Sequence, residues 1–177
     1  NNVIRLLNYS GGTTATAVTV AMGLNHPTGL AASGDGGLYI ADTLNSCIRK
    51  MDAAGNITTV LTQLLEPTGL AYAGGSLYIC ETGAGRVLKY TDGIATVIAR
   101  DLDSPQGVAV ADDGTVYVSD TGSHRVIRLE GQSRTILLQG DPAVLGERPV
   151  SPCGLLISGE KLLICDNFLQ QMIVIDR

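Results

Sequence analysis

Four acidic residues recur at equivalent positions of a repeated sequence: Asp42, Glu81, Asp120 and Asp166. Carboxylates gathered on one face could bind a metal cation or a basic ligand, because hard cations prefer oxygen ligands. A carboxylate at the end of a strand can instead cap the following turn by accepting backbone N–H groups. We favour the structural role, because a catalytic residue has no reason to recur in every repeat.

The residue after a repeated proline varies between repeats, whereas the residues around it do not. Ligand-contacting residues vary in this way on a constant frame, although ordinary rim residues do so as well. These variable residues and their polar neighbours form the candidate ligand-binding set: His26, Thr28, Glu66, Thr68, Gln106, Asp141 and Cys153. The sequence contains no Gly-rich phosphate loop, no Ser-centred elbow and no paired general acid and base. We therefore assign no catalytic residue and expect no cofactor.

The four cysteines lack the spacing of a zinc site. Cys153 could be a nucleophile if a cation stabilised its thiolate, but only Arg148 is close in sequence, so an unreactive thiol is favoured. Cys80 and Cys165 share a repeat position that is expected to hold a small, buried side chain. Four free thiols are expected, which favours a reducing or anaerobic setting. The compartment stays open, and an extracellular bacterial origin is compatible with the residues.

A repeat of about 40 residues must position all of these side chains. Each unit begins with a Pro-x-Gly motif, at Pro27, Pro67, Pro105 and Pro152. Each unit then divides into apolar runs separated by Gly, Asp, Asn and Ser, a pattern that predicts four short strands. Four strands per unit of this length indicate an all-β fold of β-propeller blades.

Composition limits the partners. The chain has 177 residues, 45% of them hydrophobic, and a formal net charge of −5. The acidic balance argues against a nucleic-acid partner, which requires clustered Lys and Arg. No apolar run reaches the roughly 18 residues that a membrane-spanning helix needs. Because the repeat runs throughout, we expect residues 1–177 to form a single propeller region.

The repeat resembles the NHL repeat. The resemblance is carried by residues 105–110 with 120–127, and more loosely by residues 42–45 and 81–87. The signature arginine of that repeat matches Arg86 and Arg125. The resemblance implies β-propeller blades, most often six, and therefore a longer chain than this one. Relatives with the same fold include lyases that bind zinc through channel histidines, and lactonases that bind calcium. His26 and Glu66 alone fall short of either ligand set, so no metal is assigned.

The given sequence begins and ends within a repeat unit. Within residues 1–21, residues 1–7 match a third strand and 14–20 a fourth strand, whereas residues 172–176 again match a third strand. Two arrangements follow, a partial propeller or a small closed ring in which residues 14–20 complete the last blade. A partial propeller has open blade edges, which invite self-association.

Strand alternation places function on one face. The loop that enters each first strand and the turn between the second and third strands should share a face, around the channel. The insertion at residues 140–151 is expected on the same face, as a recognition loop or a spacer. We expect a non-enzymatic scaffold that presents this face to a protein, peptide or carbohydrate ligand. The alternative is a metal-dependent lyase or lactonase-like enzyme with its site in the channel.

Overall fold

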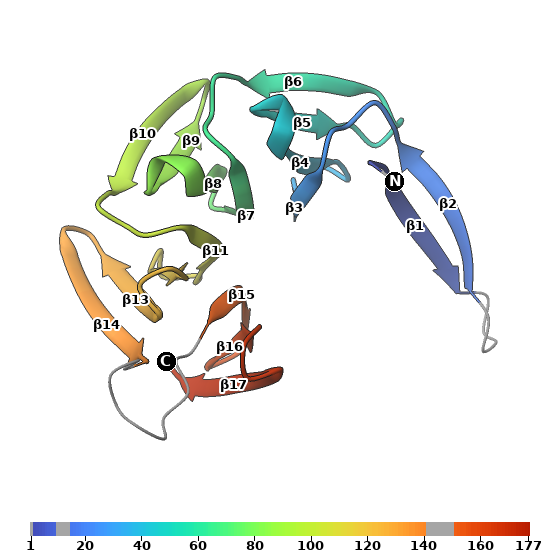
Figure 1. Cartoon of the computed structure of the whole chain (residues 1–177). Helices are drawn as coiled ribbons and strands as arrows, with labels where there is room; N and C mark the ends of the chain where they lie inside the picture. The colour runs from blue at the N-terminus through green and yellow to red at the C-terminus, as the bar shows by residue number, and fades with distance from the viewer. Residues whose placement is uncertain (1, 10–14, 141–150) are drawn as a thin grey trace.

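The structure, a computed structural model, describes residues 2–9, 15–140 and 151–177 (Figure 1). These residues form five antiparallel sheets and two short 3-10 helices, η1 (Thr43–Asn45) and η2 (Thr82–Ala84). The N-terminal sheet is β1 (Ile4–Tyr9) with β2 (Ala15–Ala21). Blade 1 is β3 (Pro27–Ala32), β4 (Leu38–Asp42), β5 (Cys47–Met51) and β6 (Ile57–Leu61). Blade 2 is β7 (Pro67–Ala73), β8 (Ser76–Glu81), β9 (Arg86–Thr91) and β10 (Ile94–Ala99). Blade 3 is β11 (Pro105–Val110), β12 (Val116–Asp120), β13 (Arg125–Glu130) and β14 (Ser133–Gln139), and blade 4 is β15 (Pro152–Ser158), β16 (Lys161–Asp166) and β17 (Gln171–Asp176).

Turn residues that tolerate a positive φ end one strand of a blade and begin the next. In blade 2, Thr91 pairs with Ile94, which leaves only Asp92 and Gly93 to reverse the chain. Both have positive φ, 50° at Asp92 and 83° at Gly93, as a type I′ hairpin turn requires. Asp and Gly tolerate that conformation, so the local sequence sets the hairpin and its register.

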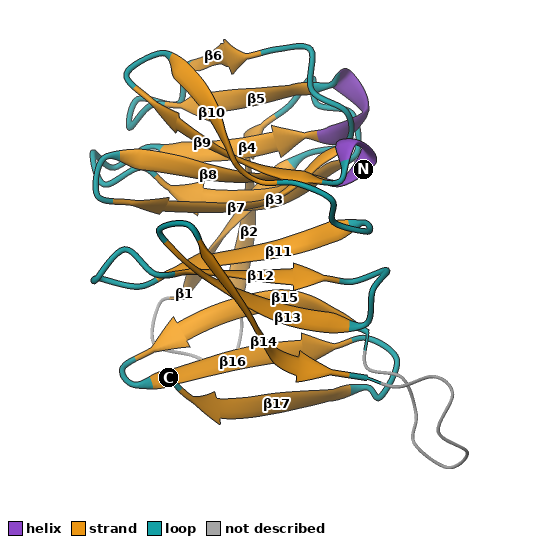
Figure 2. Ribbon diagram, turned by 90° about the vertical axis from the view of Figure 1, so that its left-hand side faces the viewer, coloured by secondary structure: helices purple, strands orange, loops and turns teal. Residues whose placement is uncertain are grey.

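The blades are arranged in an arc around a centre (Figure 1). The first strand of each blade is innermost, with β3 beside β7, β7 beside β11 and β11 beside β15. The blades stack with loops at their two ends, and η1 and η2 lie at the same end (Figure 2). That end carries the loops that enter the first strands.

The glycine of each Pro-x-Gly motif allows consecutive first strands to approach closely. A Cβ added at Gly29 would collide with the carbonyl oxygen of Thr68. A Cβ at Gly69 would collide with that of Gln106, and one at Gly107 with that of Cys153. The constant glycine therefore packs blade against blade, which explains why its neighbour can vary and the glycine does not.

Apolar side chains fill the space between consecutive blades. Blades 2 and 3 each bury one face against the preceding blade and the other against the following blade. In blade 2, Leu77 and Ile79 pack toward blade 1, while Tyr78 and Cys80 pack toward blade 3. Blade 4 packs Leu162 and Ile164 against blade 3 in the same way. The alternation of strand side chains thus produces one core layer at every junction.

In the structure β1 pairs with β2 in a two-stranded sheet, and β17 is the third strand of blade 4. The closed ring is wrong for the described strands, because β2 pairs with β1 and not with β17. The described strands form an open arc, and blade 4 has three strands (Figure 1). No helix of the described residues is long and apolar enough to cross a membrane.

Candidate functional site

A cavity of about 460 Å³ lies at the centre of the arc. Each of the four blades contributes the same three positions of its first strand: the residue after the proline, the glycine and the apolar residue that follows. The lining residues are Thr28, Gly29, Leu30, Thr68, Gly69, Leu70, Gln106, Gly107, Val108, Cys153, Gly154 and Leu155.

The structure brings together four of the seven candidate residues. Thr28, Thr68, Gln106 and Cys153 line the cavity, one from each blade. His26 and Glu66 do not line it; both are exposed and precede the prolines with φ of 54° and 50°. Asp141 and most of the insertion at residues 140–151 lie outside the described residues.

The two threonine hydroxyls are already engaged in holding blades together. Thr28 Oγ1 lies 2.7 Å from Thr43 Oγ1, which donates to the carbonyl of Pro67 at 2.8 Å. In the next blade, Thr68 Oγ1 lies 2.7 Å from Thr82 Oγ1, and Thr82 donates to the carbonyl of Pro105 at 2.6 Å. These hydroxyls can still accept a hydrogen bond from a ligand, because each oxygen has two lone pairs.

The other two candidates are freer. The side chain of Gln106 is exposed at the cavity, where its amide can both donate and accept. Cys153 is half-buried, and its Sγ lies 3.4 Å from the carbonyl oxygen of Cys165. Gln106 is thus the candidate with the most capacity for a new polar contact.

The prediction that two kinds of loop share one face is confirmed by hydrogen bonds between them. The loop before β3 accepts at Asn25 from the backbone N–H of Leu44, at 3.1 Å. The loop before β7 accepts at Glu66 from Thr82, also at 3.1 Å. Asn167 donates to Ser151 at 3.0 Å in blade 4. The rim of the cavity is therefore tied to the turns around it.

The four repeated acids are buried and structural. Asp42, Glu81 and Asp120 have no exposed side-chain surface, and Asp166 is 3% exposed. We expected each acid to cap the turn that follows it. The first three acids instead accept a backbone N–H from the loop that enters strand one. The donors are Asn25 at 2.7 Å, Leu65 at 2.8 Å and Asp103 at 2.6 Å. Among the hydrogen bonds of the described residues, Asp166 also caps its own turn, through Phe168 and Leu169.

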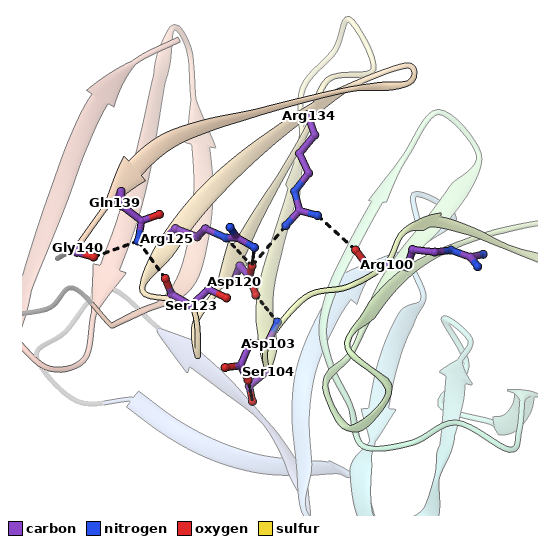
Figure 3. A network of polar contacts seen from close by, with 9 residues as sticks. All are labelled: Arg100, Asp103, Ser104, Asp120, Ser123, Arg125, Arg134, Gln139 and Gly140. Atoms are coloured by element: carbon purple, nitrogen blue, oxygen red, sulfur yellow. Dashed lines mark hydrogen bonds and ion pairs between the residues drawn. The ribbon is translucent and has the colours of Figure 1, made fainter. Parts of the chain in front are cut away.

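Arginines pair with three of these buried acids, Asp42, Glu81 and Asp120. Figure 3 shows Asp120 between the guanidinium groups of Arg125, at 2.7 Å, and Arg134, at 3.6 Å. Arg86 pairs with Glu81 at 2.6 Å. In blade 1 Cys47 stands at the arginine position, and Arg49 reaches Asp42 from two residues further along, at 3.0 Å. Comparison of equivalent repeat positions did not identify Arg49 and Arg134 as partners of the acids. An arginine on the strand after the acid, or on the strand after that, was the sequence signal that could have identified them.

The environment of Asp42 keeps it ionised. Burial alone would raise the pKa of its carboxyl group. Hydrogen bonds from the Asn25 N–H, the Asn45 amide and Arg49 outweigh burial, and the pKa lies below its ordinary value. A carboxylate with its acceptors filled by protein donors has little capacity for a ligand, so the acids position the rim rather than bind.

The cysteines differ in their surroundings. All four are free. Burial raises the pKa of the Cys80 thiol far above its ordinary value, and burial likewise raises that of Cys47. The expectation of a buried side chain at the shared repeat position holds for Cys80, but Cys165 is exposed. The reason is that blade 3 covers Cys80 and no described sheet covers Cys165.

In the described part of the chain, no three His, Cys, Asp or Glu residues are grouped to hold a metal ion.

Comparison with known proteins gives a repeat family and a fold. The NHL repeat model matches residues 24–51 and 102–129. A Rhizobium meliloti (strain 1021) protein whose name assigns it to the sugar lactone lactonases is 26% identical over 125 residues, which cover 68% of this chain and 42% of that protein. This chain thus spans less than half the length of that relative.

Solved structures of low identity share the architecture. A chain of a nidogen/laminin complex matches with a TM-score of 0.79 and 20% identity, over 93% of this chain and 65% of its own. A gluconolactonase from Xanthomonas campestris matches with a TM-score of 0.77 and 17% identity, over 98% and 67%. Virginiamycin B lyase from Staphylococcus aureus matches with a TM-score of 0.69 and 14% identity, over 90% and 55%. Two segments of the chain match the NHL repeat, and the described sheets are arranged as the blades of a β-propeller.

Proposed function

We propose that the chain is a binding module whose central cavity takes up part of a protein, peptide or carbohydrate ligand. The observation that supports it is the convergence of the four variable residues Thr28, Thr68, Gln106 and Cys153 on one cavity. A volume of about 460 Å³ lies within the roughly 300–1,000 Å³ range of ligand sites. It would hold a side chain or a sugar ring rather than a whole macromolecule.

The chemistry of the lining favours a polar ligand. Threonine hydroxyls, an exposed glutamine amide and backbone groups offer hydrogen bonds, while Leu30, Val108 and Leu155 supply apolar contact. No lining residue carries a formal charge. A neutral ligand with several hydroxyl or amide groups would fit this set without leaving a buried charge unpaired.

Ligand capture by the purified chain tests the proposal. Libraries of short peptides and of oligosaccharides are screened for a rise in melting temperature, because a ligand that binds only the folded state stabilises it. For a hit, Gln106→Ala should weaken binding about tenfold, the equivalent of one or two hydrogen bonds. Gln132→Ala, an exposed glutamine on the turn between β13 and β14, is the matched control and should not. Equal loss in both variants, or no hit at all, contradicts the proposal.

A second candidate is an enzyme, a metal-dependent lactonase or lyase with its centre in the channel. The names of the sugar lactone lactonase relative and of two structural neighbours favour it. The described residues group no three metal-binding side chains, so this candidate needs ligands from elsewhere. Elemental analysis of the purified protein separates the two. One tightly bound metal per chain, lost in His26→Ala or Glu66→Ala together with hydrolysis of a sugar lactone, would establish the enzyme.

A further inference from the structure

A tyrosine of blade 2 reaches across the junction to blade 1. Tyr90 of β9 donates from its phenol hydroxyl to the carbonyl oxygen of Val60, at 3.1 Å. Val60 is the residue of β6 that the strand ladder passes over, because Thr59 and Leu61 pair with consecutive residues of β5. The extra residue of a β-bulge is left unpaired in the ladder. At this junction the phenol therefore supplies a donor that the ladder does not.

The junction of blades 2 and 3 has the same bulge but not the tyrosine. Ile98 of β10 is passed over by the ladder, between Val97 and Ala99. Leu129 is the fifth residue of β13, as Tyr90 is the fifth residue of β9. Leucine has no hydroxyl, so the carbonyl of Ile98 receives no bond of this kind from blade 3.

A cavity of about 370 Å³ lies at this place between blades 2 and 3. One wall is formed by residues 97–101 at the end of β10, and the other by Leu129 with residues 131–134 of blade 3. Both blades have four described strands, and each packs between two other described blades. The volume lies within the roughly 300–1,000 Å³ range of ligand sites. This cavity shares no lining residue with the central cavity, so it is a second site.

Arg134 brings positive charge to one wall of this cavity. It pairs with Leu129 across the β13–β14 hairpin, so the two side chains project from the same face. Its guanidinium donates to the carbonyl of Arg100 at 3.3 Å and lies 3.6 Å from Asp120, which already pairs with Arg125 at 2.7 Å (Figure 3). One carboxylate thus faces two guanidinium groups, which leaves positive charge for an anion. The lining contains two arginines and one aspartate, so its net charge is positive in a chain of net charge −5.

The open carbonyl and the guanidinium are spaced for one aromatic ring. The Arg134 guanidinium is bonded at the carbonyl of Arg100, two residues along the chain from Ile98. Two residues of extended chain span about 6.6 Å. A benzene ring that carries a hydroxyl and a carboxylate at opposite ends covers such a distance. The apolar lining residues Val97 and Leu129 offer a surface for the ring.

We propose that the cavity between blades 2 and 3 binds a small phenol that carries a carboxylate. The hydroxyl of the ligand donates to the carbonyl of Ile98, as Tyr90 does to Val60. Its carboxylate accepts from Arg134, and its ring lies against Leu129. The junction of blades 1 and 2 contains the corresponding phenol within the chain, whereas the junction of blades 2 and 3 takes it from solution.

An NMR titration of the isotope-labelled chain with 4-hydroxybenzoate at neutral pH tests the proposal. The amide signals of Ala99, Gly131 and Ser133 should shift with one dissociation constant of about 1 mM, as suits a ligand of this size. Those of Gly69 and Gly107, at the central cavity, should not shift. No shift up to about 10 mM ligand, or shifts only at the central cavity, would overturn the proposal.

Two matched compounds separate the two polar contacts. Benzoate lacks the hydroxyl, and 4-hydroxybenzamide has the same shape without the charge. Each should bind at least about fivefold more weakly than 4-hydroxybenzoate, because each loses one hydrogen bond or its charge assistance. Equal affinity for either compound contradicts the proposed orientation and overturns the proposal.

Substitutions on the blade 3 wall test the same contacts from the protein. Leu129→Tyr introduces the residue of blade 2, so its phenol should occupy the place of the ligand and binding should be lost. Arg134→Ala should weaken binding of 4-hydroxybenzoate at least about tenfold, and of 4-hydroxybenzamide less than about threefold, because the amide forms no ion pair. Lys161→Ala, at a lysine side chain of blade 4 that is 61% exposed, is the control and should bind as the wild type does.

Circular dichroism shows whether each variant is folded. A folded Leu129→Tyr chain that binds as tightly as the wild type overturns the proposal, because the ligand would then not use the Ile98 carbonyl. If Leu129→Tyr does not fold, Arg134→Ala decides the question. An equal loss for 4-hydroxybenzoate and 4-hydroxybenzamide, or no loss for either, would show that Arg134 does not hold the carboxylate, and overturns the proposal.

Discussion

A methyl group added at Gly69 and at Gly154 should have opposite consequences, although both glycines hold the same place in the repeat. A Cβ at Gly69 would overlap the carbonyl of Gln106 and come within 3.0 Å of the Cα of Gly107. Both atoms belong to the backbone of a buried first strand and cannot turn away. At Gly154 the nearest atoms are those of Cys165, at an ordinary contact distance of 3.6 Å.

The magnitude follows from these neighbours. Overpacking at a well-packed junction costs about 1–3 kcal/mol, and a rigid backbone obstacle places Gly69→Ala at the upper end, about 3 kcal/mol. Gly154→Ala costs nothing in the single chain and could gain about 0.5 kcal/mol, because alanine restricts the unfolded chain. Neither glycine has a positive φ, so the comparison isolates the steric effect.

Urea unfolding at low protein concentration measures both variants. With a slope of about 2 kcal/mol per molar urea, Gly69→Ala should lower the midpoint by about 1.5 M. Circular dichroism and tyrosine fluorescence can follow the transition, since the chain has six tyrosines and no tryptophan. Equal midpoint shifts for the two variants would refute the reasoning, because the contacts between first strands would then not decide the cost.

Four further predictions concern the polar contacts. Thr82→Val should cost about 1 kcal/mol in urea unfolding, because the Pro105 carbonyl loses its hydroxyl donor at the junction of blades 2 and 3. Asp120→Asn should cost about 2 kcal/mol by the same measurement, because the charge-assisted hydrogen bond and ion pairs that the buried carboxylate makes with the partly exposed Arg125 and Arg134 are lost. Asp176→Asn, at a side chain that is 88% exposed, should change the free energy of unfolding by less than about 0.5 kcal/mol. Stability measured against pH should show the contribution of Asp42: its pKa in the folded state lies below the ordinary value of 3.8, so this contribution is complete above that pH and is lost as the pH falls through the lower folded value. Asp42→Asn should flatten that acid limb of the curve.

Much of the fold could be read from local residues. Pro-x-Gly marked each first strand, the acid marked the end of each second strand, and Asp-Gly turns set hairpins such as that of β9 and β10. The two short helices η1 and η2 were expected only as turns. The rim of the candidate site was also accessible, because Thr28, Thr68, Gln106 and Cys153 are variable residues on a constant frame. His26 and Glu66 directly precede two of the same prolines, so the sequence could not show that these two residues lie outside the cavity.

The contacts of the acids depended on distant residues. Asp42 binds the N–H of Asn25 from 17 positions away, and Arg134 reaches Asp120 from the next hairpin. The position of an acid in a repeat does not tell which of two adjacent loops its carboxylate faces. Capping of the own turn and bracing of the preceding loop are equally consistent with the spacing, and only the fold distinguishes them.

The sequence by itself determined the blade, because strand alternation, turn residues and the constant glycine act over a few neighbouring positions. Tertiary structure decided what each equivalent position does. Cys80 and Cys165 occupy the same place in the repeat, yet one is buried and the other exposed, because a blade covers only the first. Burial, and with it the central cavity, is a property of the neighbours that a residue meets across a junction, and the repeat alone does not contain it.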